Sequence, residues 1–150
     1  MDELDLTCIL KNGNFYNLAV EKNNYTDVVN KLGQYDERVD NDNFSYDLYW
    51  GDVCISFYKR DDSIFYIQIL LSKGKVYGKY KISDYYDEIK FHSRMEIESF
   101  LLFLNHSEIP FTITNSPSMN VDLLIVKVGE LEIFYHLEDK LFLKIHIGST

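Results

Sequence analysis

Two stretches of this chain share a pattern that requires a β-sheet. They read YWGDVCISFY at 49–58 and KVGELEIFYH at 127–136, and each places a glycine and an acid before residues that alternate around an isoleucine. Apolar residues at every second position predict a strand with one buried face. Each stretch is therefore expected to be the first strand of a hairpin, and its Gly–acid step to mark a strand entry or a bulge.

A segment with helical periodicity precedes each stretch, because apolar residues recur there at i, i+3, i+4 and i+7. These positions are Tyr25, Val28, Val29 and Leu32 in the first segment, and Ile97, Phe100, Leu101 and Leu104 in the second. Gly33 is placed to end the first helix in the left-handed conformation. Ser93, with Glu96 three residues on, has the capping-box spacing that predicts the start of the second helix.

The rest of the chain is expected to form strands and polar loops. A hairpin is predicted around Asn12-Gly13, a common turn pair, and polar loops at 34–47 and around Pro110 and Pro117. The predicted strands are 4–10, 14–20, 48–58, 63–71, a short one around Val76–Tyr80, 87–92, 122–136 and 140–147.

These elements predict an α+β fold, a mostly antiparallel sheet with two packed helices. The chain of 150 residues is long enough to bury a core as a single domain, 1–150. Its halves, 1–72 and 73–150, share the order strand, helix, loop, strand, strand. Two explanations stay open, an internal duplication or two amphipathic helix–hairpin units that are alike for physical reasons.

The net charge of −9 argues against a nucleic acid or an anionic membrane as the direct partner, because both would repel the chain. It is compatible with a basic protein partner, or simply with solubility. Cys8 and Cys54 lack the spacing of a zinc site, and the acidic N-terminus lacks the plan of a signal peptide. The apolar run at 64–71 is too short to span a bilayer. A cytoplasmic location is expected.

No catalytic or metal-binding motif stands out in the sequence. The four histidines show no metal-ligand spacing, and His146 alternates with isoleucines on a strand, which predicts that it faces water. Cys54 is expected to be a small buried hydrophobe, and no serine lies in a G-x-S-x-G context. We therefore expect a protein that is not an enzyme and that uses no cofactor and no metal.

Two acidic segments interleaved with aromatic residues are the candidate partner-binding sites. Aromatic side chains supply desolvated anchors at interfaces, and acids steer a basic partner. The first segment contributes Asp36, Glu37, Asp40, Asp42, Tyr46, Asp47 and Trp50, and the second Asp84, Tyr85, Tyr86, Asp87 and Glu88. Tyr46 or Trp50 is the expected anchor of the first. The alternative is an ordinary solvated loop at 36–47 whose aromatic residues turn inward.

The two predicted hairpins resemble segments common in small bacterial immunity proteins of polymorphic toxin systems, including contact-dependent growth inhibition. The segments that carry the resemblance are YWGDVCISFY…SIFYIQILL and KVGELEIFYH…LFLKIHI. The resemblance implies an acidic, cytoplasmic antitoxin that neutralises a cognate basic toxin domain, commonly a nuclease, by stoichiometric binding. Two alternatives remain. One is a phage-type inhibitor of a nucleic-acid-binding enzyme. The other is a small-ligand-binding or enzymatic α+β domain with His92 or Tyr85 pointing into a pocket. The sequence leaves the oligomeric state open.

Overall fold

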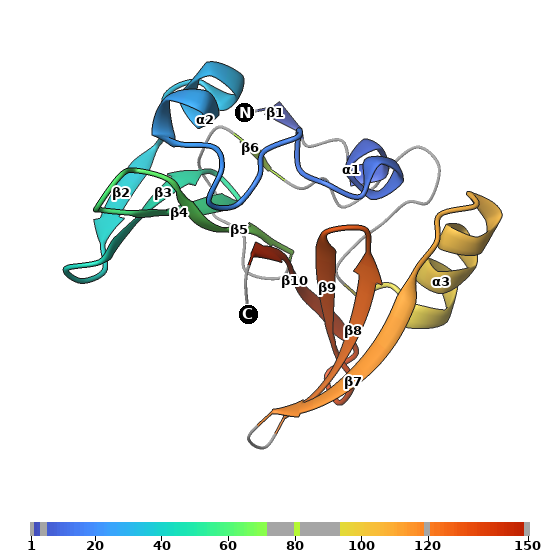
Figure 1. Cartoon of the computed structure of the whole chain (residues 1–150). Coiled ribbons are helices and arrows are strands. Elements are labelled where there is room, and N and C mark those ends of the chain that lie inside the picture. The colour runs from blue at the N-terminus through green and yellow to red at the C-terminus, as the bar shows by residue number, and fades with distance from the viewer. Residues whose placement is uncertain (1, 4–5, 72–79, 82–93, 119–120, 149–150) are drawn as a thin grey trace.

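The computed structural model describes residues 2–3, 6–71, 80–81, 94–118 and 121–148 (Figure 1). The helices are α1 (Leu6–Asn12), α2 (Tyr25–Leu32) and α3 (Ile97–His106). The strands are β1 (Asp2–Glu3), β2 (Glu37–Asp40), β3 (Ser45–Trp50), β4 (Val53–Tyr58), β5 (Ile64–Leu70), β6 (Tyr80–Lys81), β7 (Thr112–Ser118), β8 (Val121–Val128), β9 (Leu131–His136) and β10 (Leu141–Gly148).

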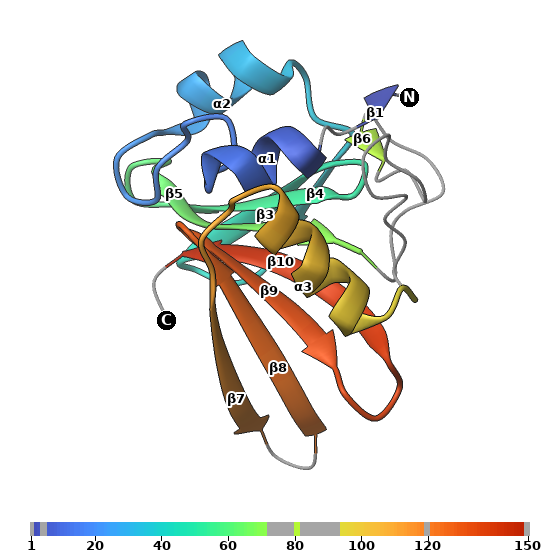
Figure 2. The ribbon, with the colours of Figure 1, turned by 90° about the vertical axis from the view of Figure 1, so that its right-hand side faces the viewer.

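Eight of the strands form one antiparallel sheet in the order β2-β3-β4-β5-β10-β9-β8-β7. Two four-stranded meanders, β2–β5 and β7–β10, therefore meet where β5 pairs with β10. The three helices lie over one face of this sheet (Figure 2). The short strands β1 and β6 pair in parallel as a separate two-stranded sheet. The expected α+β class with a mostly antiparallel sheet is confirmed, and the described residues form three helices where two were predicted.

The core lies between the helices and the sheet, because alternate residues of each central strand face the helices. Leu48, Ile55, Ile67 and Ile147 are successive partners across β3, β4, β5 and β10, and each is at most 4% exposed. This apolar row crosses the junction between the two meanders. The row joins the two meanders through a common core. Burying each side chain of this size contributes about 1.5–3 kcal/mol to the free energy of folding.

The repeated Gly–acid step is a hairpin turn, and the prediction of a strand entry or bulge was wrong. Trp50 pairs with Val53, so Gly51 and Asp52 form a two-residue loop between β3 and β4. In the same way, Gly129 and its neighbouring acid connect β8 to β9. The glycines have φ of 61° and 58°, while neither acid has positive φ, the glycine-first pattern of a type II′ turn. The predicted strands 48–58 and 122–136 are therefore each two strands.

Residues 6–12 form helix α1, and the prediction of a hairpin around Asn12-Gly13 was wrong. Leu6, Ile9 and Leu10 have helical spacing, and all three are 1% exposed. Gly13 ends this helix with φ of 66°, and its N–H donates to the carbonyl oxygen of Ile9 at 2.9 Å. An Asn-Gly pair suits a left-handed helix terminus as well as a turn, which explains the error.

Helix α2 agrees with its prediction. Asn24 accepts a hydrogen bond from the N–H of Asp27, and the carboxylate of Asp27 accepts one from the N–H of Asn24, which completes a capping box. Val28 and Leu32 are buried, and Gly33 ends the helix as predicted, although its φ of 79° and ψ of −161° lie outside the left-handed helical conformation that was expected. Helix α3 begins later than predicted: its capping residue is Glu96, whose side chain makes no capping hydrogen bond, so the prediction of a cap at Ser93 was wrong.

Two predicted loops are strands. Segment 34–47 contains β2 and the start of β3, and the segment around Pro117 contains β7. In both cases the error arose because an exposed edge strand has the polar composition that is typical of a loop. Two predicted strands, at 76–79 and 87–92, lie outside the described residues. No helix in the described ranges has both the length and the apolarity needed to cross a membrane.

Candidate functional site

The hairpin that joins β2 to β3 exposes an acidic surface at one edge of the sheet. Residues 36–44 are nine consecutive exposed residues, and we call this segment the acidic hairpin. It carries the four acids Asp36, Glu37, Asp40 and Asp42 against one base, Arg38. Strand β2 is an end strand of the large sheet, so a partner can reach its free edge as well as its exposed side chains.

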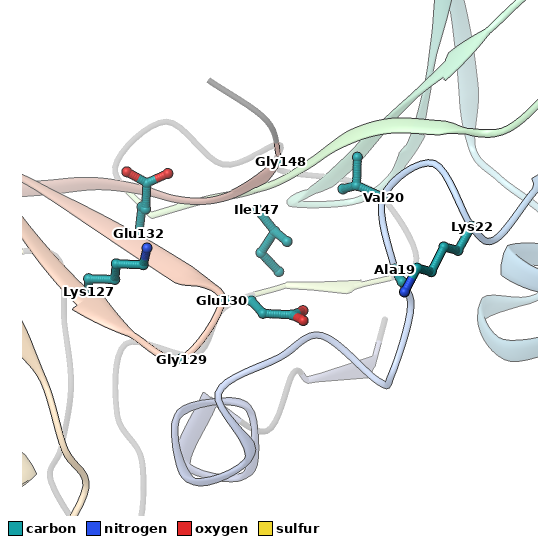
Figure 3. Close-up of a pocket in the computed structure, with 9 residues that line it drawn as sticks. All are labelled: Ala19, Val20, Lys22, Lys127, Gly129, Glu130, Glu132, Ile147 and Gly148. Carbon is teal, nitrogen blue, oxygen red and sulfur yellow. The ribbon is translucent and has the colours of Figure 1, made fainter.

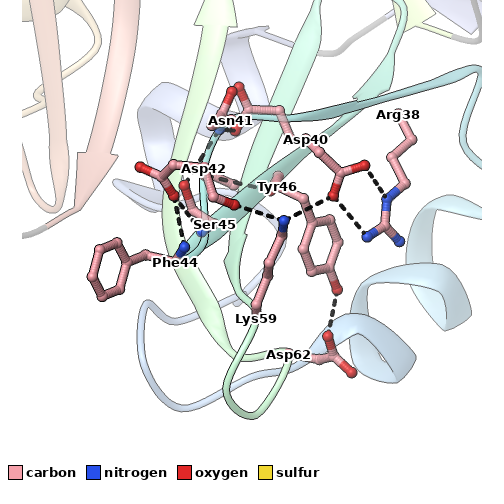
Figure 4. Close-up of polar contacts among 11 residues, drawn as sticks. Arg38, Asp40, Asn41, Asp42, Phe44, Ser45, Tyr46, Lys59 and Asp62 are labelled. Carbon is pink, nitrogen blue, oxygen red and sulfur yellow. Dashed lines mark hydrogen bonds and ion pairs between the residues drawn. The ribbon is translucent and has the colours of Figure 1, made fainter.

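Asp42 fixes the tip of the acidic hairpin. Its Oδ1 accepts hydrogen bonds from the N–H groups of Phe44 at 2.7 Å and Ser45 at 2.9 Å (Figure 4). Lys59 clamps the same loop, because its Nζ donates to the Asp42 carbonyl oxygen at 2.6 Å and its N–H donates to the Phe44 carbonyl oxygen at 2.7 Å. Phe44 is nevertheless 75% exposed. A loop held at both ends therefore presents a large apolar side chain to solvent.

Asp40 is the electrostatic centre of the acidic hairpin. Its Oδ1 lies 3.1 Å from Nη2 of Arg38 and 3.2 Å from Nζ of Lys59 (Figure 4). The hydrogen bond from Arg38, followed by the one from Lys59, lowers the pKa of the Asp40 carboxyl. The guanidinium of Arg38 also lies 4.1 Å from the centre of the Tyr46 ring. The negative charge of Asp40 is thus balanced within the chain, while its position at the edge leaves it exposed.

Acidification is expected to weaken the fold partly through Asp42. The N–H groups of Phe44 and Ser45 lower the pKa of this carboxyl from 3.8, so its contribution to stability is full above about pH 4 and declines as the pH falls further. Asp42→Asn keeps an acceptor oxygen and does not titrate. In urea unfolding at about pH 6 and about pH 3, the variant should lose less stability between the two pH values than the wild type. An equal loss would contradict this role for Asp42.

Three of the predicted binding residues are buried. Trp50 is 0% exposed and donates from Nε1 to the Gly33 carbonyl oxygen at 2.9 Å. Tyr46 is 4% exposed and donates its hydroxyl hydrogen to Asp62 at 2.7 Å. Asp47, 8% exposed, accepts a hydrogen bond from Asn41 at 2.9 Å. Neither Tyr46 nor Trp50 is available as an exposed anchor, which corrects that prediction. The alternative of a loop with inward-turning aromatic residues holds for Tyr46 alone, because the segment forms strands and Phe44 faces solvent.

Asp36 has a structural role at its position. Its Oδ2 accepts a hydrogen bond from the N–H of Gly51 at 2.7 Å, and so supports the turn between β3 and β4. Glu37, Asp40 and Asp42 remain exposed on the acidic hairpin, as the sequence predicted. The second predicted patch, Asp84, Tyr85, Tyr86, Asp87 and Glu88, lies outside the described residues.

Sequence reasoning missed the aromatic and basic residues that complete this surface. The turn between β4 and β5 brings Lys59 and Arg60 beside the tip of the acidic hairpin, around a hollow of about 580 Å³. Tyr58 and Phe65 stack in its wall with ring centres 4.7 Å apart, and Arg60 lies 4.4 Å from the centre of the Tyr58 ring. The N-D-N run at 41–43 was a signal for the tip of the acidic hairpin, because such a run between two strands favours an Asx turn. It did not indicate which residues of the next turn lie beside that tip.

The face of the sheet opposite the helices carries a row of polar and aromatic residues. Tyr49, Cys54, Gln68, His146, Glu132 and Lys127 are successive partners across six strands. His146 lies half-buried between the rings of Tyr66 and Phe134, whose centres are 5.6 and 6.4 Å away. Burial, followed by the charge of Lys144, lowers the pKa of His146. The prediction that His146 faces water holds only in part: its side chain is on the face away from the core, but it is half-buried between these rings.

A second hollow, of about 370 Å³, opens beside the turn between β8 and β9. Figure 3 places Lys22 on one side of Ile147, and Lys127 with Glu132 on the other. Glu130 also lines the opening, so two acids and two bases surround it. Throughout the part of the chain that the structure describes, no three His, Cys, Asp or Glu side chains gather as a metal site.

Comparisons with known proteins bear on the fold. No family model matches the chain, and no curated protein matches it. Among solved structures, the chain is similar to the crystal structure of a DUF4309 family protein (YjgB) from Bacillus subtilis subsp. subtilis str. 168. The two share 15% sequence identity with a TM-score of 0.52, over 97% of this chain and 94% of the other. This similarity shows a shared fold.

Proposed function

We propose that this chain is a stoichiometric protein inhibitor of the immunity type, which binds a basic toxin domain through the acidic hairpin. The observation that carries the proposal is the nine-residue exposed run at 36–44, in which four acids accompany a 75% exposed phenylalanine. Such a surface combines electrostatic steering with an apolar anchor. In this proposal Phe44 takes the anchoring role that the sequence assigned to Tyr46 or Trp50.

The distribution of charge supports a basic partner. Residues 1–72 contain 13 acids and six bases, so most of the net charge of −9 belongs to the half that carries the acidic hairpin. A cleft of a nuclease that binds phosphates offers the complementary lysines and arginines. Glu37 would occupy a phosphate position in such a cleft. The lysines and arginines of the partner would compete with Arg38 and Lys59 for Asp40. The cytoplasm, where an immunity protein meets its toxin, is the location that this proposal implies.

The test is complex formation with the product of the reading frame immediately upstream of the gene. The two purified proteins are mixed, and their stoichiometry is measured by size-exclusion chromatography with light scattering. The proposal predicts a one-to-one complex whose association rate falls as salt rises, because the steering charges are screened. Absence of a complex between two folded proteins would contradict the proposal and would favour the ligand-binding alternative.

Phe44→Ala should weaken this complex strongly. Removing a central aromatic anchor typically costs at least about 2 kcal/mol of binding free energy, which is roughly a 30-fold loss of affinity. Leu102→Ala is the matched control, because Leu102 is also a highly exposed apolar side chain, 58% exposed, but lies on α3. Surface plasmon resonance on both variants checks the prediction. Equal affinities of the two variants would place the interface away from the acidic hairpin.

We also propose that the halves 1–72 and 73–150 descend from one duplicated unit. The mirrored strand order around the β5–β10 junction supports it, as does the helix that precedes each four-stranded meander. The glycine-first turns at Gly51 and Gly129 occupy equivalent places, between the second and third strands of each meander. A related chain whose halves align with each other at clear sequence identity would establish the duplication. Relatives whose halves never align would count against it.

A further inference from the structure

One apolar row crosses the whole sheet and ends at an exposed side chain. On the face covered by the helices, its successive members are Trp50, Val53, Ile69, Ile145, Ile133, Val126 and Ile113. The first six are at most 1% exposed, whereas Ile113, on the end strand β7, is 44% exposed. The row therefore ends without a neighbour to cover its last member in the described part of the chain.

The two end strands of the sheet differ in charge. Strand β2 places Glu37, Arg38 and Asp40 within four residues, and charged side chains on an edge oppose pairing with another chain. Strand β7 lies within 109–121, thirteen residues without any charged side chain in a chain of net charge −9. At this edge two copies of the chain can approach without direct contact between like charges.

We propose that β7 is a self-association edge, at which a second copy of this chain adds its own β7 in antiparallel orientation. A two-fold axis at Ile113 places the two Ile113 side chains directly opposite each other and continues the apolar row into the second copy. This pairing is centred on Ile113, so it spans 111–115 and stops short of Pro117, which lacks an N–H group. The acidic hairpin lies on the opposite edge of the sheet and remains accessible in such a dimer.

The test is sedimentation equilibrium of the full chain from micromolar to near-millimolar concentration. The proposal predicts a monomer–dimer equilibrium that shifts toward dimer as salt is added, because salt screens the repulsion between two acidic copies. Ile113→Lys should raise the dimer dissociation constant at least about tenfold, because it places like charges opposite each other. Asn115→Lys, an exposed change on the same strand, should act in the same direction.

Val39→Lys is the matched control. Val39 is 39% exposed at the middle of the other end strand, so the change adds the same charge at an edge that the proposal leaves unpaired. Its dissociation constant should stay within about twofold of wild type, the scale of effects at uninvolved surface positions. A wild-type chain that stays monomeric at every concentration would overturn the proposal. So would a dimer that Val39→Lys disrupts and that Ile113→Lys and Asn115→Lys leave intact.

Discussion

Gly129→Ala will destabilise the protein by roughly 3 kcal/mol or more, through two effects that act together. The residue has φ of 58°, a left-handed conformation that costs an L-residue about 1–2 kcal/mol. A Cβ at this position would also lie 2.7 Å from the carbonyl oxygen and 2.8 Å from the Cα of Gly13, both backbone atoms. Relieving that overlap requires the end of α1 to move off the sheet. Urea unfolding measures the loss.

The control for this prediction is Gly51→Ala, at the equivalent position of the first Gly–acid turn. Gly51 has φ of 61°, so alanine there carries the backbone cost and leaves the approach of Gly13 to Gly129 intact. The hydrogen bond from the Glu130 N–H to the Gly13 carbonyl oxygen, 2.8 Å long, should also persist in the control. If the two variants were equally stable, close packing of α1 on the second turn would not contribute to stability.

Trp50→Ala should destabilise the protein by about 3–5 kcal/mol, the usual cost of truncating a fully buried tryptophan. The variant loses the packing of a 0% exposed ring, and it also leaves the carbonyl oxygen of Gly33 without the indole N–H. Phe44→Ala, which removes an aromatic ring that is 75% exposed, should change stability by no more than about 0.5 kcal/mol. Thermal and urea unfolding of the two variants make the comparison.

Fluorescence tests the burial of Trp50 directly, because it is the sole tryptophan of the chain. The native emission should be blue-shifted and protected from iodide quenching, and it should shift to the red on unfolding. Strong quenching of the native protein by iodide would contradict the buried position. It would also restore Trp50 as an exposed binding residue.

Periodicity predicted the buried elements well, because burial imposes the spacing that the sequence shows. Helix α2 follows its apolar pattern closely. Strands β5 and β10 lie where they were predicted, but a register shift in the pairing of each interrupts the alternation, so that β10 buries Phe142, Ile145 and Ile147. The antiparallel α+β class followed from these elements. The pairing of β5 with β10 could not be read from the sequence, since residues far apart in the chain meet there.

The errors fall where one local signal fits two structures. Asn12-Gly13 suits both a hairpin turn and a helix end, and long-range packing of α1 decided between them. Strand β2 consists of four exposed residues, so its strand character comes from pairing with β3 rather than from a buried face. Strand β3 turns Tyr46 and Trp50 inward, while the acids of β2 stay exposed. The sequence thus predicted the charge of the candidate site and misassigned its aromatic anchor.

The most direct test of the central claim is amide hydrogen–deuterium exchange, comparing the chain alone with its mixture with the upstream gene product. The account predicts slower exchange on binding in the acidic hairpin, residues 36–44, and in the adjoining turn at Lys59 and Arg60. Residues of α3 around Leu102 should exchange equally in both states. Protection confined to α3 or to the sheet face around His146, or no protection anywhere, would contradict the claim that the acidic hairpin binds the partner.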